Sequence, residues 1–376
     1  KKNAEKLFGK KLNISASQLE KFNLCRFSYF CNYGLNVRER QRAEINPMQY
    51  GTIVHYILER FFSEYTKEEY LSLEEDKFQK IVCAYLAEYA VKYFGEEQLE
   101  SNSFTYRLKT ILDNVMYLMK HIMEELSQSE FFVADCELKI GEDIPSYTIV
   151  LPDGHKIAVC GSVDRVDIMQ RADITYLRII DYKTGTKQFK LSDILYGINL
   201  QMLLYLHSIE ASGGDKYGEI VPAGILYMPA TVPYISSDSL KSIDKLPDEL
   251  NKKLKMNGLL LKDTEIIHGM DKTDAATYIP VKIKAGEPVS STSLATLAEF
   301  GKIFKKVDML IAEMGKNIYN GNIEAKPLKG GHDSCEYCPY DSVCAYRQSN
   351  PITCFSVDNK TVIEEITNEI NGKEEE

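Results

Sequence analysis

The chain has 376 residues, of which 44% are hydrophobic, so it can bury a large core in one elaborated domain or in two. Its formal net charge is −10, which argues against a protein that grips nucleic-acid phosphates over its whole surface. The sequence contains no signal peptide and no apolar run long enough for a membrane span, and its nine cysteines are an odd number. We therefore expect no membrane association and a cytoplasmic, reducing compartment without disulfides.

The first third of the chain is predicted to be helical. Ser15 is a helix-capping residue, and the helix that it begins leads to Cys25. Apolar residues with a period near 3.6 predict longer helices over residues 48–65, 73–93 and 103–127. His55 lies on the first of these within an apolar stripe, so an ordinary core histidine is the simplest interpretation of this residue alone.

Strands are predicted to follow the helices. Residues 133–140 form the first, and Glu137 on it is a candidate for a metal site. Two apolar runs, residues 157–168 and 176–182, predict a β-hairpin whose turn lies at 170–175.

The hairpin carries a group of charged residues. Asp181 and Lys183 are two residues apart, so their side chains face the same way on a strand. An adjacent antiparallel strand can bring Asp164 beside them. Two carboxylates bind a hard cation such as Mg²⁺ through oxygen, and a lysine beside them can orient water or stabilise phosphate charge. This combination of two carboxylates and a lysine is suited to the cleavage of a phosphodiester bond.

Asp167 competes with Asp164 for this role. It lies three residues further on, so on a regular strand it faces the opposite side, and only one of the two can share a metal with Asp181. The alternative for both is a solvated strand face on which Arg165 is the salt-bridge partner.

After the hairpin the chain is predicted to alternate between helices and one further strand. The predicted elements are a helix over 192–211, a buried strand at 223–228, an irregular polar insertion from residue 230, and an amphipathic helix over 293–319. Gln201 and Tyr205 lie four residues apart on the first helix and could be ordinary neighbours on its surface. The acidic residues 364–376 are predicted to be frayed or disordered.

The cysteines suggest a second metal centre. Cys335, Cys338 and Cys344 form a compact C-x2-C-x5-C cluster near the end of the chain. A zinc site would need a fourth ligand, for which His332 and Cys354 are the local candidates. Cys25 is a remote candidate and Cys31 its rival, whereas Cys83, Cys136 and Cys160 lie in apolar runs typical of buried small hydrophobic residues.

The order of these motifs resembles a known family. His55, Asp164, Asp181-x-Lys183 and Gln201-x3-Tyr205 occur as in the RecB-like branch of the PD-(D/E)xK nuclease superfamily. The resemblance implies an α/β restriction-endonuclease-like core, with a central mixed sheet flanked by helices and a large N-terminal helical segment. It also implies a Mg²⁺ site at Asp164, Asp181 and His55, a catalytic Lys183, and active-site or DNA-strand contacts for Gln201 and Tyr205.

The cysteine pattern points to one group of proteins within this family. One cysteine before the core and three after it, here Cys25 with Cys335, Cys338 and Cys344, are similar to the iron–sulfur staple of AddB-type subunits of bacterial helicase–nucleases. This resemblance implies a [4Fe–4S] cluster, an AddA-type partner subunit, and single-stranded DNA cut by an exonuclease that resects double-strand breaks for recombinational repair. Such subunits carry a helicase-like region before the nuclease. This chain begins Lys1-Lys2 and has no G-x4-G-K-[ST] loop, so we expect it to be an excised C-terminal domain.

The resemblance also suggests a division of the chain. The expected segments are an N-terminal cysteine segment (1–47), a helical segment with the histidine motif (48–130), a nuclease core with the cysteine loop (131–345) and an acidic tail (346–376). Three other functions stay open at this point. They are a CRISPR-adaptation-type RecB-like nuclease, a non-catalytic nuclease-fold module that guides DNA, and a zinc-binding interaction module.

Overall fold

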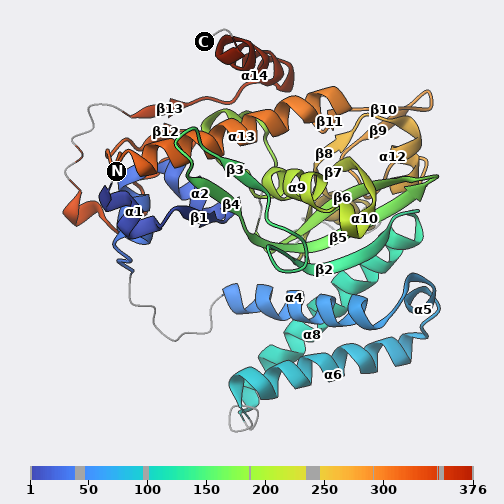
Figure 1. Ribbon diagram of the computed structural model, residues 1–376. Helices are drawn as coiled ribbons and strands as arrows, with labels where there is room; N and C mark the ends of the chain where they lie inside the picture. Colours follow the sequence, from blue (N-terminus) through green and yellow to red (C-terminus); the bar gives the residue numbers. More distant parts are fainter. Residues whose placement is uncertain are drawn as a thin grey trace.

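The computed structural model describes residues 2–38, 47–95, 101–185, 188–233, 246–290, 292–344, 346 and 351–374. The centre of the molecule is a mixed sheet with helices on both sides (Figure 1). This architecture confirms the predicted α/β fold. Within the described ranges, no helix is long and apolar enough to cross a membrane.

The main sheet has six strands in the order β11-β8-β7-β6-β5-β2. Their bounds are Phe132–Ile140 for β2, Gly161–Arg171 for β5, Ile174–Lys183 for β6, Glu219–Pro229 for β7, Asn257–Leu261 for β8 and Leu294–Ala295 for β11. β2, β5 and β6 are antiparallel neighbours, so β5 and β6 form the predicted hairpin. β6 and β7 are parallel and therefore need a crossover. The crossover consists of η2 (Leu191–Tyr196), α9 (Gln201–Ser212) and α10 (Gly214–Tyr217).

A second, three-stranded sheet has the order β1-β4-β3. Its strands are β1 (Lys11–Ile14), β3 (Thr148–Val150) and β4 (Lys156–Val159). The prediction of one strand over residues 157–168 is therefore wrong, because the chain leaves this sheet at Cys160 and enters the main sheet at Gly161. Gly161 at this junction allows close packing of α9, since a Cβ there would overlap the hydroxyl oxygen of Tyr205.

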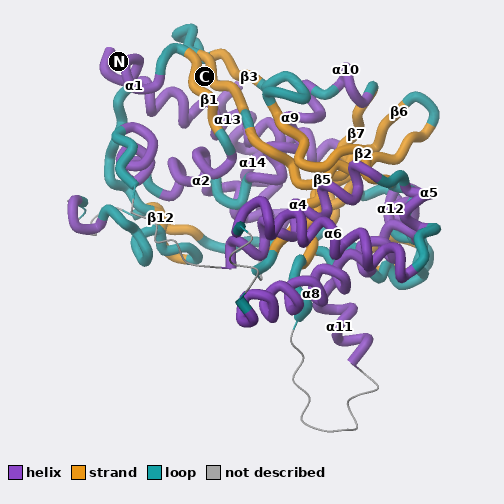
Figure 2. Tube along the Cα trace, turned by 90° about the horizontal axis from the view of Figure 1, so that it is seen from below, coloured by secondary structure: helices purple, strands orange, loops and turns teal. Residues whose placement is uncertain are grey.

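The predicted helical segment lies on the side of β2. Its helices are α4 (Pro47–Glu64), α5 (Lys67–Leu71), α6 (Glu75–Phe94) and α8 (Asn102–Ser127). Figure 2, viewed from below, shows α4, α6 and α8 in front of the sheet. α4 packs against β2 and β6, and the buried ring of Phe61 on α4 contacts Phe78 of α6 with centroids 5.7 Å apart. These contacts place His55 of α4 beside the strands that carry the acidic residues.

The N-terminal segment and the C-terminal part of the chain lie together on the other side (Figure 1). The N-terminal helices are α1 (Lys2–Phe8), α2 (Ala16–Leu24), α3 (Arg26–Tyr29) and the π-helical turn η1 (Phe30–Gly34). Ser15 caps α2 as predicted, and its hydroxyl accepts a hydrogen bond from the backbone N–H of Gln18. The long helix α13 (Leu297–Tyr319) packs on α2, α9 and β4.

Two predictions for the C-terminal half are wrong. The insertion after residue 230 contains regular structure in its described part, namely α11 (Leu246–Leu254), β8, α12 (Thr264–Met270), β9 (Lys282–Lys284) and β10 (Glu287–Val289). β8 extends the main sheet because its leucines are buried beside β7.

The tail is not frayed, because residues 359–374 form the helix α14 (Asn359–Glu374). Val362, Ile366 and Ile370 recur every four residues and are buried, which gives this acidic helix one apolar face. Its Glu369 pairs with Lys306 of α13, with Oε2 and Nζ 2.6 Å apart. Before this helix, the chain forms β12 (Leu328–Gly330), η4 (Asp341–Val343) and β13 (Ile352–Cys354).

Candidate active site

The β5–β6 hairpin brings two aspartates together. Arg165 pairs with Ile180 across the hairpin, so the preceding Asp164 and the following Asp181 are neighbours on adjacent strands. Asp181 is 2% exposed, and the Asp164 side chain is 12% exposed. The Asp164 carboxylate is held in place by a 2.9 Å hydrogen bond that its Oδ2 accepts from the backbone N–H of Tyr182.

His55 and Glu137 complete a compact group with Asp164. His55 Nδ1 lies 3.0 Å from Glu137 Oε1, and His55 Nε2 lies 3.6 Å from Asp164 Oδ2. One ligand atom from each of the three residues lies within 4.8 Å of the others, as binding of a single cation requires. The hydroxyl of Ser162 donates a 2.8 Å hydrogen bond to the second oxygen of Glu137. The structure thus places the three residues of this group around one point.

Glu137 has a strained backbone. Its φ is +49°, in the left-handed region that side-chain-bearing residues rarely adopt, although it lies inside a strand. Its neighbours Cys136 and Leu138 keep a regular antiparallel register with Arg165 and Val163, so the distortion is confined to one residue. A φ of this kind costs roughly 1–3 kcal/mol, and active sites are among the places where such residues cluster.

The charges in the group change its proton affinities. Burial, and then the adjacent Asp181 charge, raise the pKa of Asp164 to about 7. Burial alone would lower the pKa of His55, but the Glu137 hydrogen bond and the nearby carboxylates raise it above its ordinary value. Crowded carboxylates of this kind are stabilised by a cation, which fits an oxygen-rich site for a hard metal ion.

Lys183 points to the same group. Its Nζ lies 2.5 Å from Oδ2 of Asp181, outside the angles of a hydrogen bond, so this buried oxygen makes no hydrogen bond to a described residue. His55, Glu137, Tyr182 and Lys183 line a cleft of about 820 Å³, whereas the buried Asp181 does not line it. The cleft therefore adjoins the carboxylate group, because His55 and Glu137 belong to both.

Gln201 and Tyr205 lie on α9, which packs against β6 and β7. Tyr205 is buried with its hydroxyl against Gly161, and burial raises the pKa of Tyr205 to about 12, with a smaller contribution from the Asp164 charge. Gln201 begins the helix and is half-buried. Neither residue lines the described cleft, so the structure brings Tyr205 near the carboxylate group but does not bring Gln201 into contact with it.

Asp167 belongs to a different group. It faces away from Asp164, as predicted, but it is fully buried rather than solvated. Its carboxylate accepts hydrogen bonds from Arg165 Nε at 2.8 Å and Nη2 at 2.7 Å, and from Arg178 Nε at 3.0 Å. Glu125 of α8 accepts from both arginines, at 3.1 and 2.6 Å. The sequence analysis did not identify Arg178 and Glu125 as partners of Asp167. The only signal for a buried ion-pair network was the presence of charged residues within an apolar strand.

The four cysteines of the proposed cluster meet at the junction of the two chain ends. Cys25, Cys335, Cys338 and Cys344 line one pocket of about 120 Å³. The structure therefore brings the cysteine that precedes the sheet to the three cysteines that follow it.

The rival ligands are placed differently. Cys31 lies near this pocket without lining it; burial, and then Cys338 and Cys344, raise the pKa of its thiol. His332 is exposed, and Cys354 is buried on β13 opposite Gly330.

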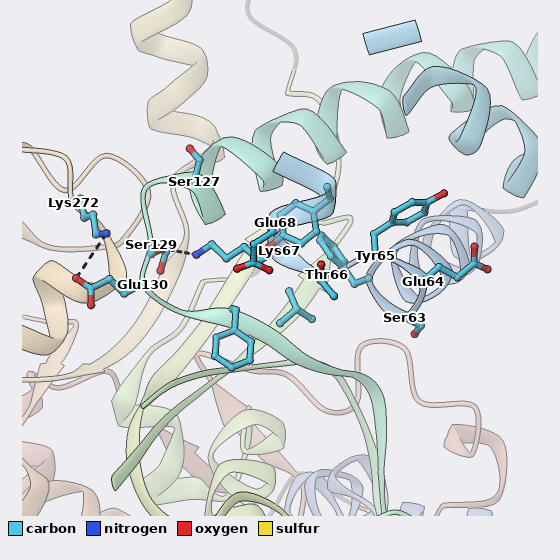
Figure 3. Close-up of a pocket in the computed structure, with 14 residues that line it drawn as sticks. Ser63, Glu64, Tyr65, Thr66, Lys67, Glu68, Ser127, Ser129, Glu130 and Lys272 are labelled. Carbon is cyan, nitrogen blue, oxygen red and sulfur yellow. Dashed lines mark hydrogen bonds and ion pairs between the residues drawn. The ribbon is translucent and has the colours of Figure 1, made fainter. Parts of the chain in front are cut away.

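Another hollow, of about 950 Å³, lies at the far end of α4 (Figure 3). Its lysines are already engaged, since Lys67 Nζ donates to the carbonyls of Ser129 and Phe131 at 2.6 and 2.9 Å, and Lys272 pairs with Glu130. It contains none of the carboxylates of the hairpin group, although it is larger than the cleft. We therefore assign the chemistry to the cleft.

A mixed sheet that presents paired hairpin aspartates and a lysine next to a helical histidine is the architecture of the PD-(D/E)XK nuclease superfamily. Residues 13–345 match this superfamily, and the chain belongs to it. Among curated proteins, the chain is similar to the B subunit of the ATP-dependent helicase/deoxyribonuclease of Thermoanaerobacter sp. (strain X514), with 34% identity over 91% of this chain and 30% of the relative. The protein of the same name from Clostridium kluyveri (strain NBRC 12016) is 35% identical over 99% of this chain and 33% of the relative. The chain thus spans about a third of the length of these relatives.

Proposed function

We propose that the chain is the deoxyribonuclease domain of a helicase–nuclease B subunit, and that it hydrolyses single-stranded DNA with Mg²⁺ as an exonuclease during resection of double-strand breaks. The observation that carries the proposal is the convergence of His55, Glu137 and Asp164 around one point, with Asp181 and Lys183 beside them. The similarity to helicase/deoxyribonuclease B subunits supports the same assignment.

The residues of the site fit the chemistry of a divalent cation. Asp164, Asp181, Glu137 and His55 would hold it, and when bound it would polarise the scissile phosphate and make a water molecule more acidic. Asp181 would then no longer need Lys183 as its counter-ion. The Lys183 ammonium, which lies beside Asp181, would then orient the attacking water and stabilise charge that develops on the phosphate. Tyr182 keeps Asp164 in place through its backbone N–H.

The four clustered cysteines would hold a [4Fe–4S] cluster in this proposal. Their shared pocket joins a residue before the nuclease core to three residues after it, so the cluster would close almost the whole chain into a loop. Loop closure of this length restricts the unfolded chain and stabilises the fold.

The net charge of −10 implies that the domain alone binds DNA weakly and that its binding falls steeply with salt. The proposal therefore includes an AddA-type partner subunit and a helicase-like region of the same polypeptide, which would supply most of the grip on DNA. The alternative of a non-catalytic guiding module is disfavoured because the chain retains Asp164, Asp181 and Lys183, with Asp164 grouped with His55 and Glu137 and with Lys183 beside Asp181.

Cleavage of labelled single-stranded DNA, with and without Mg²⁺, tests the catalytic proposal. Asp181→Asn should abolish cleavage, because it removes a charge from the carboxylate group. Asp173→Asn is the matched control, since Asp173 is exposed in the turn of the same hairpin. Unchanged cleavage by Asp181→Asn would refute the assignment of the site.

Anaerobic purification followed by iron, sulfide and zinc analysis tests the proposed cluster. Cys344→Ser should lose iron and lower the melting temperature, whereas Cys354→Ser should retain iron because Cys354 lies outside the pocket. Stoichiometric zinc without iron in the wild-type chain would contradict the assignment.

A further inference from the structure

Three tyrosines form one wall of the cleft that leads to the carboxylates. Tyr56 lies on α4, one residue after His55, and Tyr89 and Tyr93 lie one turn apart on α6. Glu137 and Lys183 line the same cleft. A strand of nucleic acid whose phosphate reaches the metal site therefore passes alongside these aromatic rings.

The three rings pack in a row, with the buried Tyr89 between the partly buried Tyr56 and the exposed Tyr93. The centroids of Tyr56 and Tyr89 are 5.2 Å apart, and those of Tyr89 and Tyr93 are 4.4 Å apart with planes inclined by 35°. Tyr89 is 5% exposed, whereas Tyr93 is 56% exposed. The buried Tyr89 ring thus packs against the Tyr93 ring and supports it. The Tyr93 ring is exposed to solvent and lines the cleft.

The exposure of Tyr93 is not needed to end the helix. Phe94, the next residue, anchors the end of α6 against Phe104 of α8 with centroids 5.1 Å apart, and it also contacts Tyr89. The Tyr56 ring is held by a polar contact, because its hydroxyl donates a 2.8 Å hydrogen bond to Glu88. The surrounding side chains therefore fix the platform before a ligand arrives.

The charge of the cleft indicates which part of a nucleic acid this wall contacts. Lys139 and Lys183 line the cleft, but so do Glu59 and Glu137, and the chain as a whole is acidic. Attraction to phosphates is therefore a weak source of affinity here. Stacking of a base on an aromatic ring contributes about 1–3 kcal/mol per base without a charge, so stacking is the stronger source of affinity at this wall.

We propose that Tyr93, supported by Tyr89, is a stacking platform for an unpaired DNA base, and that it selects single strands for the cleft. Bases in a duplex stack on one another and cannot offer a free face to the ring. The Lys92 ammonium lies over the Tyr93 ring, with Nζ 5.1 Å from the ring centroid, and its flexible side chain would move aside for the base and contact the adjacent phosphate. This inference rests on the proposed function, because it assigns the substrate of the same cleft.

Equilibrium binding separates the platform from the catalytic site. Fluorescence anisotropy would be measured with an oligothymidylate of about 20 nucleotides, a length that covers a typical single-strand site, in an Asp181→Asn background. Tyr93→Ala should raise the dissociation constant roughly 10-fold, and Tyr93→Phe should stay close to the parent because it keeps the ring. The matched control is Tyr106→Ala, since Tyr106 is 74% exposed on the neighbouring α8 but does not line the cleft.

An abasic oligonucleotide of the same length identifies the contact. It keeps the phosphates and lacks the bases, so the parent chain should bind it more weakly and Tyr93→Ala should cause no further loss. An equal loss on both oligonucleotides would mean that Tyr93 contacts the backbone, and it would overturn the stacking proposal. Unchanged binding of oligothymidylate by Tyr93→Ala, with an unchanged melting temperature, would also overturn it.

Cleavage by the otherwise wild-type chain keeps the two proposals distinguishable. Tyr93→Ala should raise KM for single-stranded DNA and leave kcat nearly unchanged, because Tyr93 does not touch the carboxylate group. If the wild-type chain cleaves and Tyr93→Ala behaves like it, the platform is wrong and the nuclease assignment stands. If the wild-type chain does not cleave but binding depends on Tyr93 and on bases, the nuclease assignment is wrong and the platform stands.

Discussion

Asp167→Ala should unfold the chain more easily without disabling the cleft. Asp167 is fully buried and accepts three hydrogen bonds from Arg165 and Arg178, and Glu125 supplies the second negative charge. The four side chains are therefore neutral as a group. Removal of one carboxylate leaves an uncompensated positive charge where water cannot reach it.

The magnitude follows from that imbalance. Breaking a buried ion pair by removing one partner costs about 3–5 kcal/mol, because the remaining charge is desolvated and unpaired. In a chain of 376 residues, a loss of about 3–5 kcal/mol lowers the melting temperature by roughly 4–6 °C. The change to alanine also removes volume, but in a small side chain this is the lesser effect.

Thermal unfolding followed by circular dichroism measures the change, with the exposed Asp173→Asn as control. The double variant Asp167→Ala/Arg178→Met restores charge balance and should recover part of the lost stability, with a coupling of at least about 1 kcal/mol. Cleavage by the folded Asp167→Ala chain, measured well below its melting temperature, should stay within a few-fold of wild type because Asp167 faces away from Asp164. A melting temperature equal to that of wild type would refute the reasoning.

Further predictions concern pH, packing and metal. Burial alone would lower the pKa of His207, but hydrogen bonding to Asp308 raises it to about 9, above the ordinary 6.5. The stability from this pair is therefore fully present below pH 6.5 and lost as the pH rises through 9; His207→Gln should lower the melting temperature at pH 6 and have little effect at pH 10. Gly161→Ala should cost about 1–3 kcal/mol in denaturant unfolding, because its Cβ would overlap the Tyr205 hydroxyl oxygen, and wild-type stability would contradict this steric argument. Mg²⁺ should raise the melting temperature of wild type but not of Asp164→Asn, and an equal rise in both would place the ion elsewhere.

The hairpin and its acidic face could be predicted from local sequence. Alternation along a strand is enough to place Asp181 and Lys183 on one face, and antiparallel pairing is enough to bring Asp164 beside them. The structure has these neighbours, although the turn is shorter than expected and is centred on Ala172 and Asp173. Helix periodicity likewise located α4, α6 and α8 to within a few residues.

Features that depend on contacts between distant segments could not be predicted. Glu125 joins the buried network across the interface between α8 and the hairpin, and no local pattern marks that partner. The acidic composition of the tail concealed three buried residues on one face of α14. In the same way, Tyr89 and Tyr93 look like ordinary core residues of an amphipathic helix until the packing of α4 against α6 defines a cleft.

The strained backbone at Glu137 affects which substitutions this position can accept during evolution. A glycine or asparagine accepts a φ of +49° more readily than glutamate does, so substitution there would remove strain while discarding a carboxylate. If selection acted on folding alone, glutamate at this position would therefore be replaced over time. Only a requirement for its carboxylate opposes that replacement. Descendants of this chain that no longer cut DNA should accumulate glycine or asparagine at position 137 early, before they lose the buried aspartates that the surrounding strands help to hold.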